Sequence, residues 1–364
     1  MRSLPVVLCC VLLATLTAAF KKCDNCKRIT NCAPAMQLAR LNSRAALQQL
    51  QVAFCGFDVI QKVCCSDLLP TRLMNEKNAQ TSGDEIENHR NIRLLPTECG
   101  DVDGNKIIGG TTAGLFEFPW MALISYNYNG ILMFKCGGTV ITARYVLTAA
   151  HCINQHIVAV RIGDYDVSQA EDCVGEDEIL DCASKYQDIF VTHKIAHFGY
   201  VSRPYVLNDI GLLRLATPVD FSYVNSGVIC LPVTKELREK DLSGERGVVT
   251  GWGLTENQTK SNILLKVELP IFSKSSCNTF YKGISKQEKV DRMTNTFCAG
   301  ETGHDSCNGD SGGPLMVETF YDDLYKYVQF GVVSYGSRTC GLDKPGIYTD
   351  VRKFMKWILD TIKP

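Results

Sequence analysis

Residues 107–364 contain many short apolar runs that are rich in β-branched and aromatic residues and end at Gly, Asn or Asp. Representative runs are Ile131–Phe134, Ile157–Ile162, Gly247–Thr250 and Val328–Val333. Short strands separated by turn residues are typical of all-β barrels and sandwiches. The end differs, because four apolar positions fall on one face of a helix: Phe354, Trp357, Ile358 and Ile362. The pattern predicts an all-β domain that ends in a helix.

The first residues form another pattern. Arg2 precedes an apolar run from Val6 to Leu16 that is too short to span a bilayer. Small residues follow, which predicts cleavage after Ala19. We therefore expect residues 1–19 to be a secretory signal peptide; a buried apolar segment is the alternative. No later apolar stretch reaches the length of about 18 residues that a membrane anchor needs.

Cysteine is the informative count, because the chain holds 18. So many thiols are not expected in a reducing cytosol, and their spacing is not that of tandem zinc-binding pairs. Cys9 and Cys10 leave with the predicted signal peptide, and an even number remains. Lys+Arg 38 and Asp+Glu 39 nearly balance, which argues against a nucleic-acid partner. The chain is predicted to be a secreted, oxidised, globular protein.

Residues 23–65 form a first, cysteine-rich module. Its six cysteines are Cys23, Cys26, Cys32, Cys55, Cys64 and Cys65. A segment this short buries too little apolar surface to fold alone, so disulfides are expected to hold it together, and spacing alone allows about 15 pairings. Apolar residues between Cys32 and Cys55 recur at loosely helical spacing. Residues 66–106 are polar, and we expect a linker and an activation segment there.

The segment 309–314 (GDSGGP) places a serine among glycines. Glycines permit positive φ and let backbone N–H groups converge on one point, as an oxyanion hole requires. Ser311 is therefore a candidate nucleophile, and Gly309 and Ser311 are candidate oxyanion donors. A Gly-rich turn without a chemical role is the alternative.

A serine nucleophile needs a base, and the base needs an orienting acid. Of the six histidines, His151 stands out, because small neighbours in residues 148–152 (TAAHC) leave room around its ring. Asp209 stands at the head of the apolar run 210–215, where a carboxylate entering a core must find a donor. His151 is a suitable donor. A turn-forming Asn-Asp pair is the alternative for Asp209.

With these motifs in the order His151, Asp209, Ser311, residues 107–364 resemble trypsin-like serine proteases of the chymotrypsin fold. Six further segments match: 106–110 (KIIGG), 118–120 (FPW), 136–138 (CGG), 251–253 (GWG), 334–336 (SYG) and 345–348 (PGIY). The resemblance implies a chymotrypsin-like double antiparallel β-barrel with a C-terminal helix. It implies that Ser311 attacks the peptide carbonyl, that His151 carries the proton, and that Asp209 orients His151. Residues 23–65 resemble the clip domain that precedes such domains in arthropods.

The resemblance also implies a substrate pocket. Asp305 matches its base, Ser306 stands beside it, and Gly336 and Gly346 match the walls. A buried carboxylate at the base would be costly unless a substrate Arg or Lys paired with it. Cleavage after Arg or Lys is therefore expected; an ordinary surface carboxylate is the alternative.

An activation switch is a further implication. Lys106 precedes Ile107, so a protease that cuts after basic residues would free the Ile107 amine. By resemblance this amine inserts beside Asp310 and orders the oxyanion loop. The chain is accordingly expected to be a zymogen.

Eight disulfides are expected. Family connectivity implies Cys23–Cys64, Cys26–Cys55 and Cys32–Cys65 in the clip domain. In the protease domain it implies Cys136–Cys152, Cys277–Cys298 and Cys307–Cys340, with Cys99–Cys230 as the bridge between the chains after cleavage. Cys173 and Cys182 remain and are expected to pair across an acidic loop.

No cofactor is required by the resemblance. Related proteases bind calcium near the acidic loop, so Asp164 and Asp172 are candidate structural ligands; a solvated acidic face is the alternative. Asn257 begins the sequence NQT and is a candidate N-glycosylation site.

Three functions fit these features. The first is an active clip-domain protease in haemolymph, in an innate-immune cascade that leads to prophenoloxidase activation (melanisation) or processes the Toll-pathway ligand. Its expected partners are downstream zymogens, an upstream activating protease, a serpin and a docking partner of the clip domain, with no membrane partner. A non-catalytic clip-domain cofactor is the second, disfavoured because all three triad residues are present. A digestive trypsin is the third, disfavoured because digestion needs no docking domain.

Overall fold

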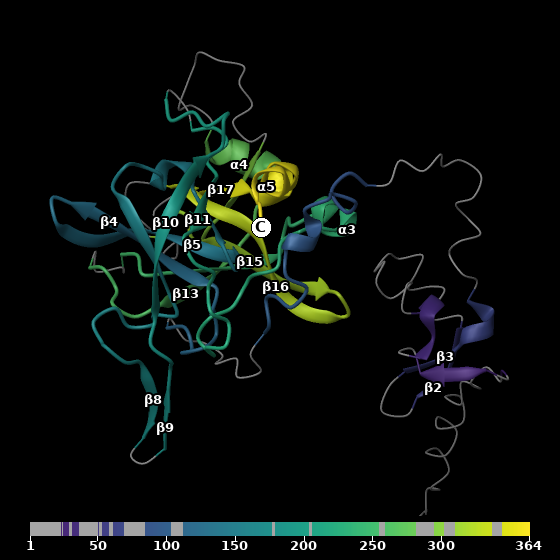
Figure 1. The fold of residues 1–364 in the computed structure, drawn as a ribbon. Coiled ribbons are helices and arrows are strands. Elements are labelled where there is room, and N and C mark those ends of the chain that lie inside the picture. The colour runs from purple at the N-terminus through teal and green to yellow at the C-terminus, as the bar shows by residue number, and fades with distance from the viewer. Residues whose placement is uncertain are drawn as a thin grey trace, which may run out of the picture. The chain divides into compact units, whose positions relative to one another are not determined.

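The computed structural model describes the chain in two units, residues 1–82 and 83–364 (Figure 1). The described residues are 23, 25–28, 31–35, 50, 53–57, 61–68, 84–102, 112–176, 179–203, 206–254, 259–281, 295–301, 310–336 and 344–364. The predicted signal peptide and most of the predicted clip-domain helix lie outside them. No helix among the described residues is long and apolar enough to cross a membrane.

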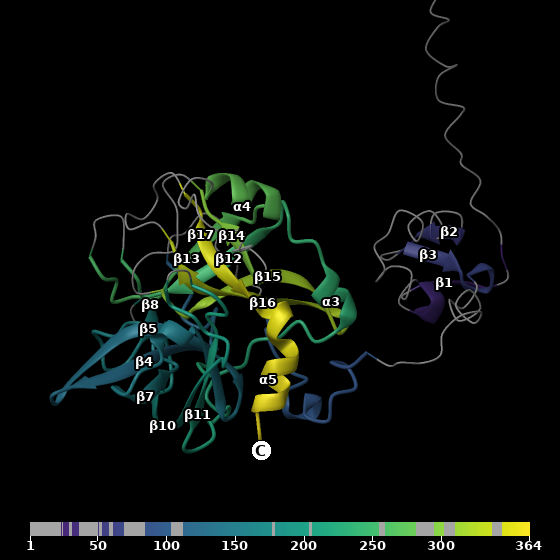
Figure 2. The same ribbon diagram turned by 90° about the horizontal axis from the view of Figure 1, so that it is seen from above.

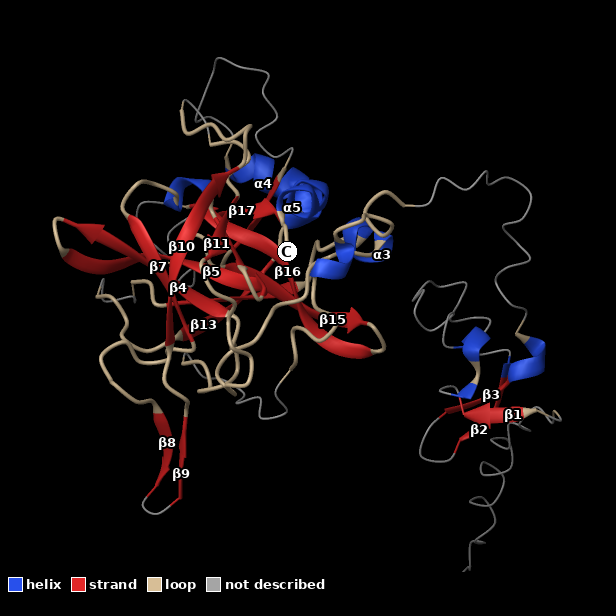
Figure 3. Cartoon of the chain, in the orientation of Figure 1, coloured by secondary structure: helices blue, strands red, loops and turns tan. Residues whose placement is uncertain are grey.

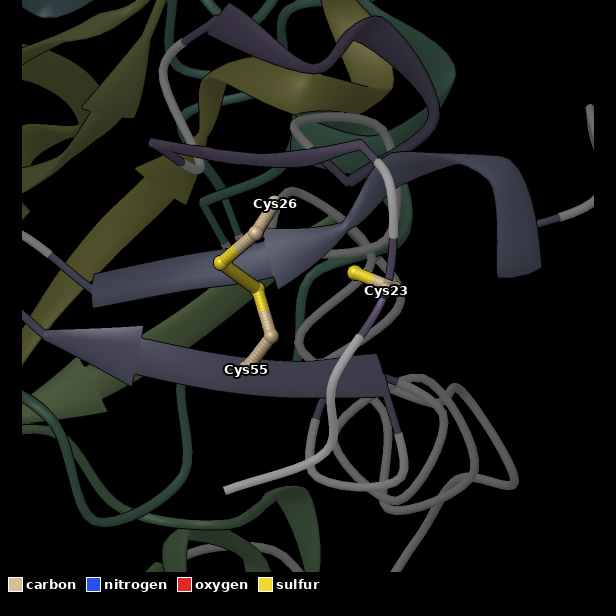
Figure 4. A group of neighbouring side chains, drawn as sticks. All are labelled: Cys23, Cys26 and Cys55. Atoms are coloured by element: carbon tan, nitrogen blue, oxygen red, sulfur yellow. A yellow bond between two sulfur atoms is a disulfide. The ribbon is translucent and has the colours of Figure 1, made fainter.

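The small unit is a three-stranded antiparallel sheet held by disulfides. Its strands are β1 (Cys26–Arg28), β2 (Phe54–Phe57) and β3 (Gln61–Cys64), in the order β1-β3-β2, followed by the 3₁₀ helix η2 (Cys65–Asp67). Val63 is fully buried within a core of only a few described side chains. Figure 4 shows Cys23 beside the Cys26–Cys55 disulfide, and Cys23 itself pairs with Cys64. These sulfurs are therefore oxidised and offer no thiolate to a metal.

The first half of the large unit is a closed six-stranded barrel in the order β10-β11-β6-β5-β4-β7. Its strands are β4 (Met121–Tyr128), β5 (Ile131–Thr142), β6 (Tyr145–Thr148), β7 (Ile157–Ile162), β10 (Gln187–Ala196) and β11 (Gly211–Leu215). Strands β8 (Cys173–Glu176) and β9 (Ile179–Cys182) form a separate two-stranded ribbon. Asn129 and Gly130 join β4 to β5 with φ of 55° and 89°. Both values are left-handed, as a two-residue type I′ hairpin turn requires.

The second half is a six-stranded antiparallel sheet in the order β13-β12-β15-β16-β17-β14. Figure 3 draws the strands of both halves in red. Its strands are β12 (Arg246–Gly251), β13 (Leu265–Pro270), β14 (Thr296–Ala299), β15 (Pro314–Tyr321), β16 (Leu324–Tyr335) and β17 (Gly346–Asp350). A bridge between Ile271 and Ala299 joins the two edges, so the sheet curls into a second barrel. The expected double β-barrel is therefore confirmed.

The large unit also contains short helices outside the two barrels. They are η4 (Ile92–Leu94), η5 (Ala150–Cys152), α3 (Lys235–Glu239), α4 (Lys274–Phe280), η6 (Val351–Phe354) and α5 (Met355–Thr361). The predicted C-terminal helix is present, but its first turn is the 3₁₀ helix η6 and only the rest is α-helical. Of the predicted strands, Ile157–Ile162 coincides with β7, and the other three runs lie within β5, β12 and β16.

One hydrophobic core runs through both barrels. Trp120, which is 1% exposed, packs its ring edge-on against Tyr327 with 6.0 Å between ring centroids. Its Nε1 lies 3.1 Å from Met316 Sδ. Trp120 precedes β4 of the first barrel, whereas Met316 and Tyr327 belong to β15 and β16 of the second. This continuous packing fixes the barrels against each other, which a site between them requires.

Residues 84–102 are part of the large unit and contribute to its core. Ile86 and Cys99 belong to its core, and Leu94, Leu95 and Val102 pack on that core partly buried. The sequence pattern assigned this segment to the linker, because its apolar positions are few and irregularly spaced.

Candidate active site

Strand register brings His151 beside Asp209. Gly211, the first residue of β11, pairs with Thr148, the last residue of β6. His151 follows Thr148 in the 3₁₀ helix η5, and Asp209 immediately precedes β11. Two residues that are far apart in sequence are therefore placed side by side by the pairing of two neighbouring strand ends.

Asp209 accepts two hydrogen bonds from His151. Its Oδ1 accepts the backbone N–H of His151 at 2.9 Å, and its Oδ2 accepts Nδ1–H at 2.8 Å. The Asp209 side chain is 2% exposed and that of His151 is 30% exposed. The imidazole is thus held in the tautomer with the proton on Nδ1, and Nε2 is left to accept a proton.

The second barrel supplies further donors to Asp209. Ser334 Oγ, on β16, donates to Asp209 Oδ2 at 2.5 Å, and Thr349 Oγ1, on β17, donates to the Asp209 carbonyl at 2.8 Å. Burial and the nearby Asp209 charge raise the pKa of Tyr200, so this neighbour stays neutral. The buried carboxylate is therefore satisfied by hydrogen bonds, as burial of a charge demands.

Ser311 lies in a tight turn before β15. Gly313 N donates to the Asp310 carbonyl at 2.8 Å, and Gly137 N, on β5, donates to the Ser311 carbonyl at 2.9 Å. Gly312 has φ of 80°, and a Cβ at this position would lie 2.2 Å from Thr148 Oγ1. Only glycine fits here, because both the backbone conformation and the space exclude a side chain.

The Cys136–Cys152 disulfide lies between the candidate base and the candidate nucleophile. Cys152 Sγ is 3.6 Å from His151 Nε2 and 3.6 Å from the Ser311 carbonyl oxygen. In the described part of the chain no hydrogen bond joins the Ser311 hydroxyl to His151. Hydrogen bonds of this kind often tighten only when substrate is bound, so the arrangement is compatible with general-base catalysis.

Asp310 occupies a space that glycines leave open. Its Oδ1 accepts the backbone N–H of Gly253 at 2.9 Å. A Cβ at Gly251 would lie 2.1 Å from the same oxygen, and one at Gly253 would lie 2.4 Å from Oδ2. The segment 251–253 therefore forms a cradle for this carboxylate.

The structure places part of the predicted substrate pocket. Gly336 follows β16, and Gly346 begins β17; because Tyr335 pairs with Ile347, both glycines lie at the same end of two neighbouring strands. Several predicted site residues lie outside the described residues: Lys106, Ile107, Asn257, Asp305, Ser306, Gly309 and the Cys307–Cys340 pair.

Seven of the expected disulfides are present among the described residues. They are Cys23–Cys64, Cys26–Cys55, Cys32–Cys65, Cys99–Cys230, Cys136–Cys152, Cys173–Cys182 and Cys277–Cys298. Cys99–Cys230 joins the segment before the predicted cleavage site to the catalytic unit.

The candidate calcium ligands do not fit calcium in their observed contacts. Asp164 Oδ2 accepts from the Arg161 guanidinium at 3.1 Å, and burial raises the pKa of Asp164. Both oxygens of Asp172 accept backbone N–H groups, from Tyr165 at 2.9 Å and Asp166 at 3.0 Å. Only Asp164 Oδ1 is left buried without a partner, whereas calcium takes about six to eight oxygens. These two carboxylates instead stabilise the loop through Arg161 and the backbone.

Sequence reasoning left four supporting residues without a role. Ser334 and Thr349 bind Asp209, and Gly251 and Gly253 surround Asp310. Three of them stand in the segments 251–253 and 334–336, which were noted as family matches. The signal was therefore present, but only the folded chain shows which carboxylate each residue serves.

Comparisons with known proteins agree with this geometry. The family model described as Trypsin matches residues 107–358. The CLIP domain-containing serine protease HP8 of Bombyx mori is 35% identical over 98% of this chain and 97% of its own length. Melanization protease 1 of Drosophila melanogaster is 37% identical over 87% of this chain and 81% of its own. The crystal structure of the Drosophila Grass clip serine protease of the Toll pathway aligns with a TM-score of 0.64 and 30% identity, over 92% and 93% of the two chains.

Two substitutions distinguish the hydrogen bond that Asp209 accepts from Ser334 from the negative charge of Asp209 itself. The hydrogen bond from Ser334 exists before and during catalysis, so Ser334→Ala should lower the free energy of unfolding by about 1.5–3 kcal/mol but kcat by less than about tenfold, with KM unchanged. Asp209→Asn should lower kcat by about 10⁴, because the imidazole loses its tautomer. Denaturant unfolding and steady-state kinetics measure both quantities.

The matched control is Ser226→Ala, which removes a buried serine that bonds only backbone carbonyls of Asp220 and Tyr223. Its kcat should not change. An equal loss of kcat in Ser334→Ala and Asp209→Asn would contradict the assignment of distinct roles.

Proposed function

The chain belongs to the trypsin family of serine endopeptidases and carries a clip domain; from this premise we propose that it is a secreted zymogen which, once cleaved, cuts proteins after Arg or Lys in an extracellular innate-immune cascade. The proposed catalytic activity rests on one observation: the buried Asp209 carboxylate accepts a hydrogen bond from His151 Nδ1, and the turn with Ser311 lies nearby. The clip domain carries the regulatory part, since a digestive enzyme needs no docking module.

Each residue of the triad has one task in the proposed reaction. His151 Nε2 takes the proton of the Ser311 hydroxyl while Oγ bonds to the substrate carbonyl carbon. The imidazolium then gives this proton to the leaving amine, and a water molecule repeats the sequence to release the acid product. Asp209 keeps the imidazole oriented and stabilises its charged form, and backbone N–H groups of Gly309 and Ser311 bind the oxyanion.

The proposed pocket selects a basic side chain. Asp305 would stand at its base, Ser306 beside it, and Gly336 and Gly346 in its walls. A carboxylate there needs a cation, and a substrate Arg or Lys provides one through a charge-assisted hydrogen bond. The glycines leave room for a long side chain.

Activation is proposed to follow cleavage between Lys106 and Ile107. The new Ile107 amine would pair with Asp310, whose carboxylate already rests in the cradle of Gly251 and Gly253. Because Asp310 precedes Ser311, this pairing would order the oxyanion turn. The Cys99–Cys230 disulfide would keep the light chain, the part before the cut, attached.

The relatives support an immune role. One is named for melanization and another belongs to the Toll pathway, so the proposed substrates are zymogens of prophenoloxidase activation or the Toll ligand. An upstream protease, a serpin and a clip-docking protein are the proposed partners, and haemolymph is the proposed location. Incubating the activated enzyme with candidate zymogens and sequencing the new N-termini tests the substrate.

Ser311→Ala should abolish peptidase activity and leave folding intact. Without a nucleophile, kcat should fall by about six orders of magnitude, while secretion and cleavage at Lys106 stay normal. Turnover of an Arg reporter measures the loss, and Ser222→Ala, at an exposed serine, is the control. Comparable turnover by Ser311→Ala would refute the triad.

Asp305→Ser should remove the preference for basic residues. The substrate cation would be buried without a partner, at a cost of about 3–5 kcal/mol or roughly two to four orders of magnitude in kcat/KM. Reporters with Arg, Lys and Leu at the cleaved position measure this preference, and the Leu reporter is the internal control. Undiminished preference for Arg would show that the pocket has another base.

Lys106→Gln should give a folded zymogen that trypsin-like activators cannot switch on, because no amine forms at Ile107. N-terminal sequencing and activity after activator treatment check this outcome. The cleaved wild type should show one band on non-reducing gels and two on reducing gels. Full activity of Lys106→Gln without a new N-terminus at Ile107 would overturn the switch.

A further inference from the structure

Residues 84–95, here called the strap, lie along two helices of the catalytic unit. The blue segment of Figure 1 runs beside α3, and Figure 2 shows it next to α5. Ile86 is buried in the main core, and Leu94 and Leu95 pack against that core. These apolar contacts lie before the proposed cleavage site, so they belong to the future light chain.

The strap binds α3 through acidic side chains. Arg238 Nη2 lies 2.6 Å from Asp84 Oδ1 and 3.8 Å from Glu87 Oε1. Glu87 also accepts the backbone N–H of Lys235, at the first residue of α3. Hydrogen bonding to Arg238 lowers the pKa of Asp84 to about 2, so this carboxylate is charged at neutral pH.

The strap also caps the end of α5. Asn91 Nδ2 donates to the carbonyls of Leu359 and Ile362 at 2.8 and 3.2 Å. Carbonyls at a helix C-terminus have no α-helical partner within the helix, and a side chain such as that of Asn91 can satisfy them in place of water. His89 Nε2 lies 2.9 Å from Asp360 Oδ1, and the His89 side chain is 9% exposed.

A second contact follows at the disulfide. Gly100 N donates to the Val228 carbonyl at 2.8 Å, and Tyr327 N donates to the Gly100 carbonyl at 2.7 Å. The Nζ atom of the buried Lys326 lies 3.4 Å from Asp101 Oδ1. Non-covalent contacts thus lie on both sides of Cys99.

We propose that the strap is a docking element that holds the light chain on the activated catalytic domain without the help of the Cys99–Cys230 disulfide. This inference rests on the proposed cleavage at Lys106, which makes the strap part of a separate chain. The occupant of the α3–α5 surface is therefore this chain's own segment before and after activation.

The contacts differ in how much they contribute to the binding free energy of the light chain. Exposed ion pairs such as Lys356–Glu85 contribute little, because water and salt screen them. Asn91, by contrast, is partly buried, and removing it leaves carbonyls without a donor. Ile86 adds apolar burial. We expect Ile86, Asn91 and the partly buried Asp84–Arg238 pair to dominate retention, because loss of Asp84 leaves the Arg238 guanidinium without its nearest carboxylate.

The test uses the full-length zymogen with Cys99→Ser and Cys230→Ser. After cleavage, size-exclusion chromatography at micromolar concentration should find the light chain with the catalytic domain. Adding Asn91→Ala should raise the dissociation constant about tenfold, and adding Asp84→Ala as well should release the light chain. Arg93→Ala, at an exposed position of the strap, is the matched control and should leave the complex intact.

Two outcomes would overturn the proposal: release of the light chain when only the disulfide is removed, or equal retention by Asn91→Ala, Asp84→Ala and Arg93→Ala. N-terminal sequencing keeps the premise separate, because a cut elsewhere than Lys106 refutes the proposed activation and not the strap. Should the double cysteine variant not fold, hydrogen exchange on the disulfide-intact enzyme decides. Asn91→Ala must then expose amides of α5 at least several-fold more than Arg93→Ala, and equal exchange would refute docking.

Discussion

The burial of one carboxylate governs the arrangement of the catalytic unit. Asp209 is 2% exposed, and a charge so deeply buried is tolerated only when donors surround it. The first barrel provides two donors through His151, and the second provides Ser334, while Thr349 fixes the backbone of Asp209. Neither barrel alone supplies all of these donors, so the full set of hydrogen bonds around Asp209 forms only when both barrels have folded and packed together.

Empty space is the second constraint. Gly312 must leave room for Thr148 and for the Gly137 carbonyl, and Gly251 and Gly253 must leave room for Asp310. A Cβ at any of these positions would lie within 2.4 Å of an oxygen atom. The turn that carries Ser311 is therefore shaped by the absence of side chains as much as by its hydrogen bonds.

The all-β class and the candidate residues His151 and Ser311 could be predicted because their signals are local: short β-rich runs, small residues around His151, glycines around Ser311. The double barrel and the triad followed from the resemblance to trypsin-like serine proteases. The pairing of Ser334 with Asp209 could not be predicted, since it depends on strands that meet only in the folded chain. The strap was missed for a related reason. Its apolar residues, such as Ile86 and Leu94, follow no period. Its polar partners on α3 and α5 lie more than a hundred residues away in sequence. The pairing of Asp164 with Arg161 was not predicted either, because an acidic residue in a loop can bind a nearby arginine as well as a metal ion.

The attachment of the strap and the Cys99–Cys230 bridge has a consequence for where hydrolysis occurs. A protease that kept no link to its N-terminal module would diffuse away after activation. With the proposed cleavage at Lys106, the module and the catalytic domain would remain one molecule, so binding of the module to a surface would confine the enzyme near that surface. Proteolysis would then be limited in space to the place where the clip domain binds, without any change at the scissile bond.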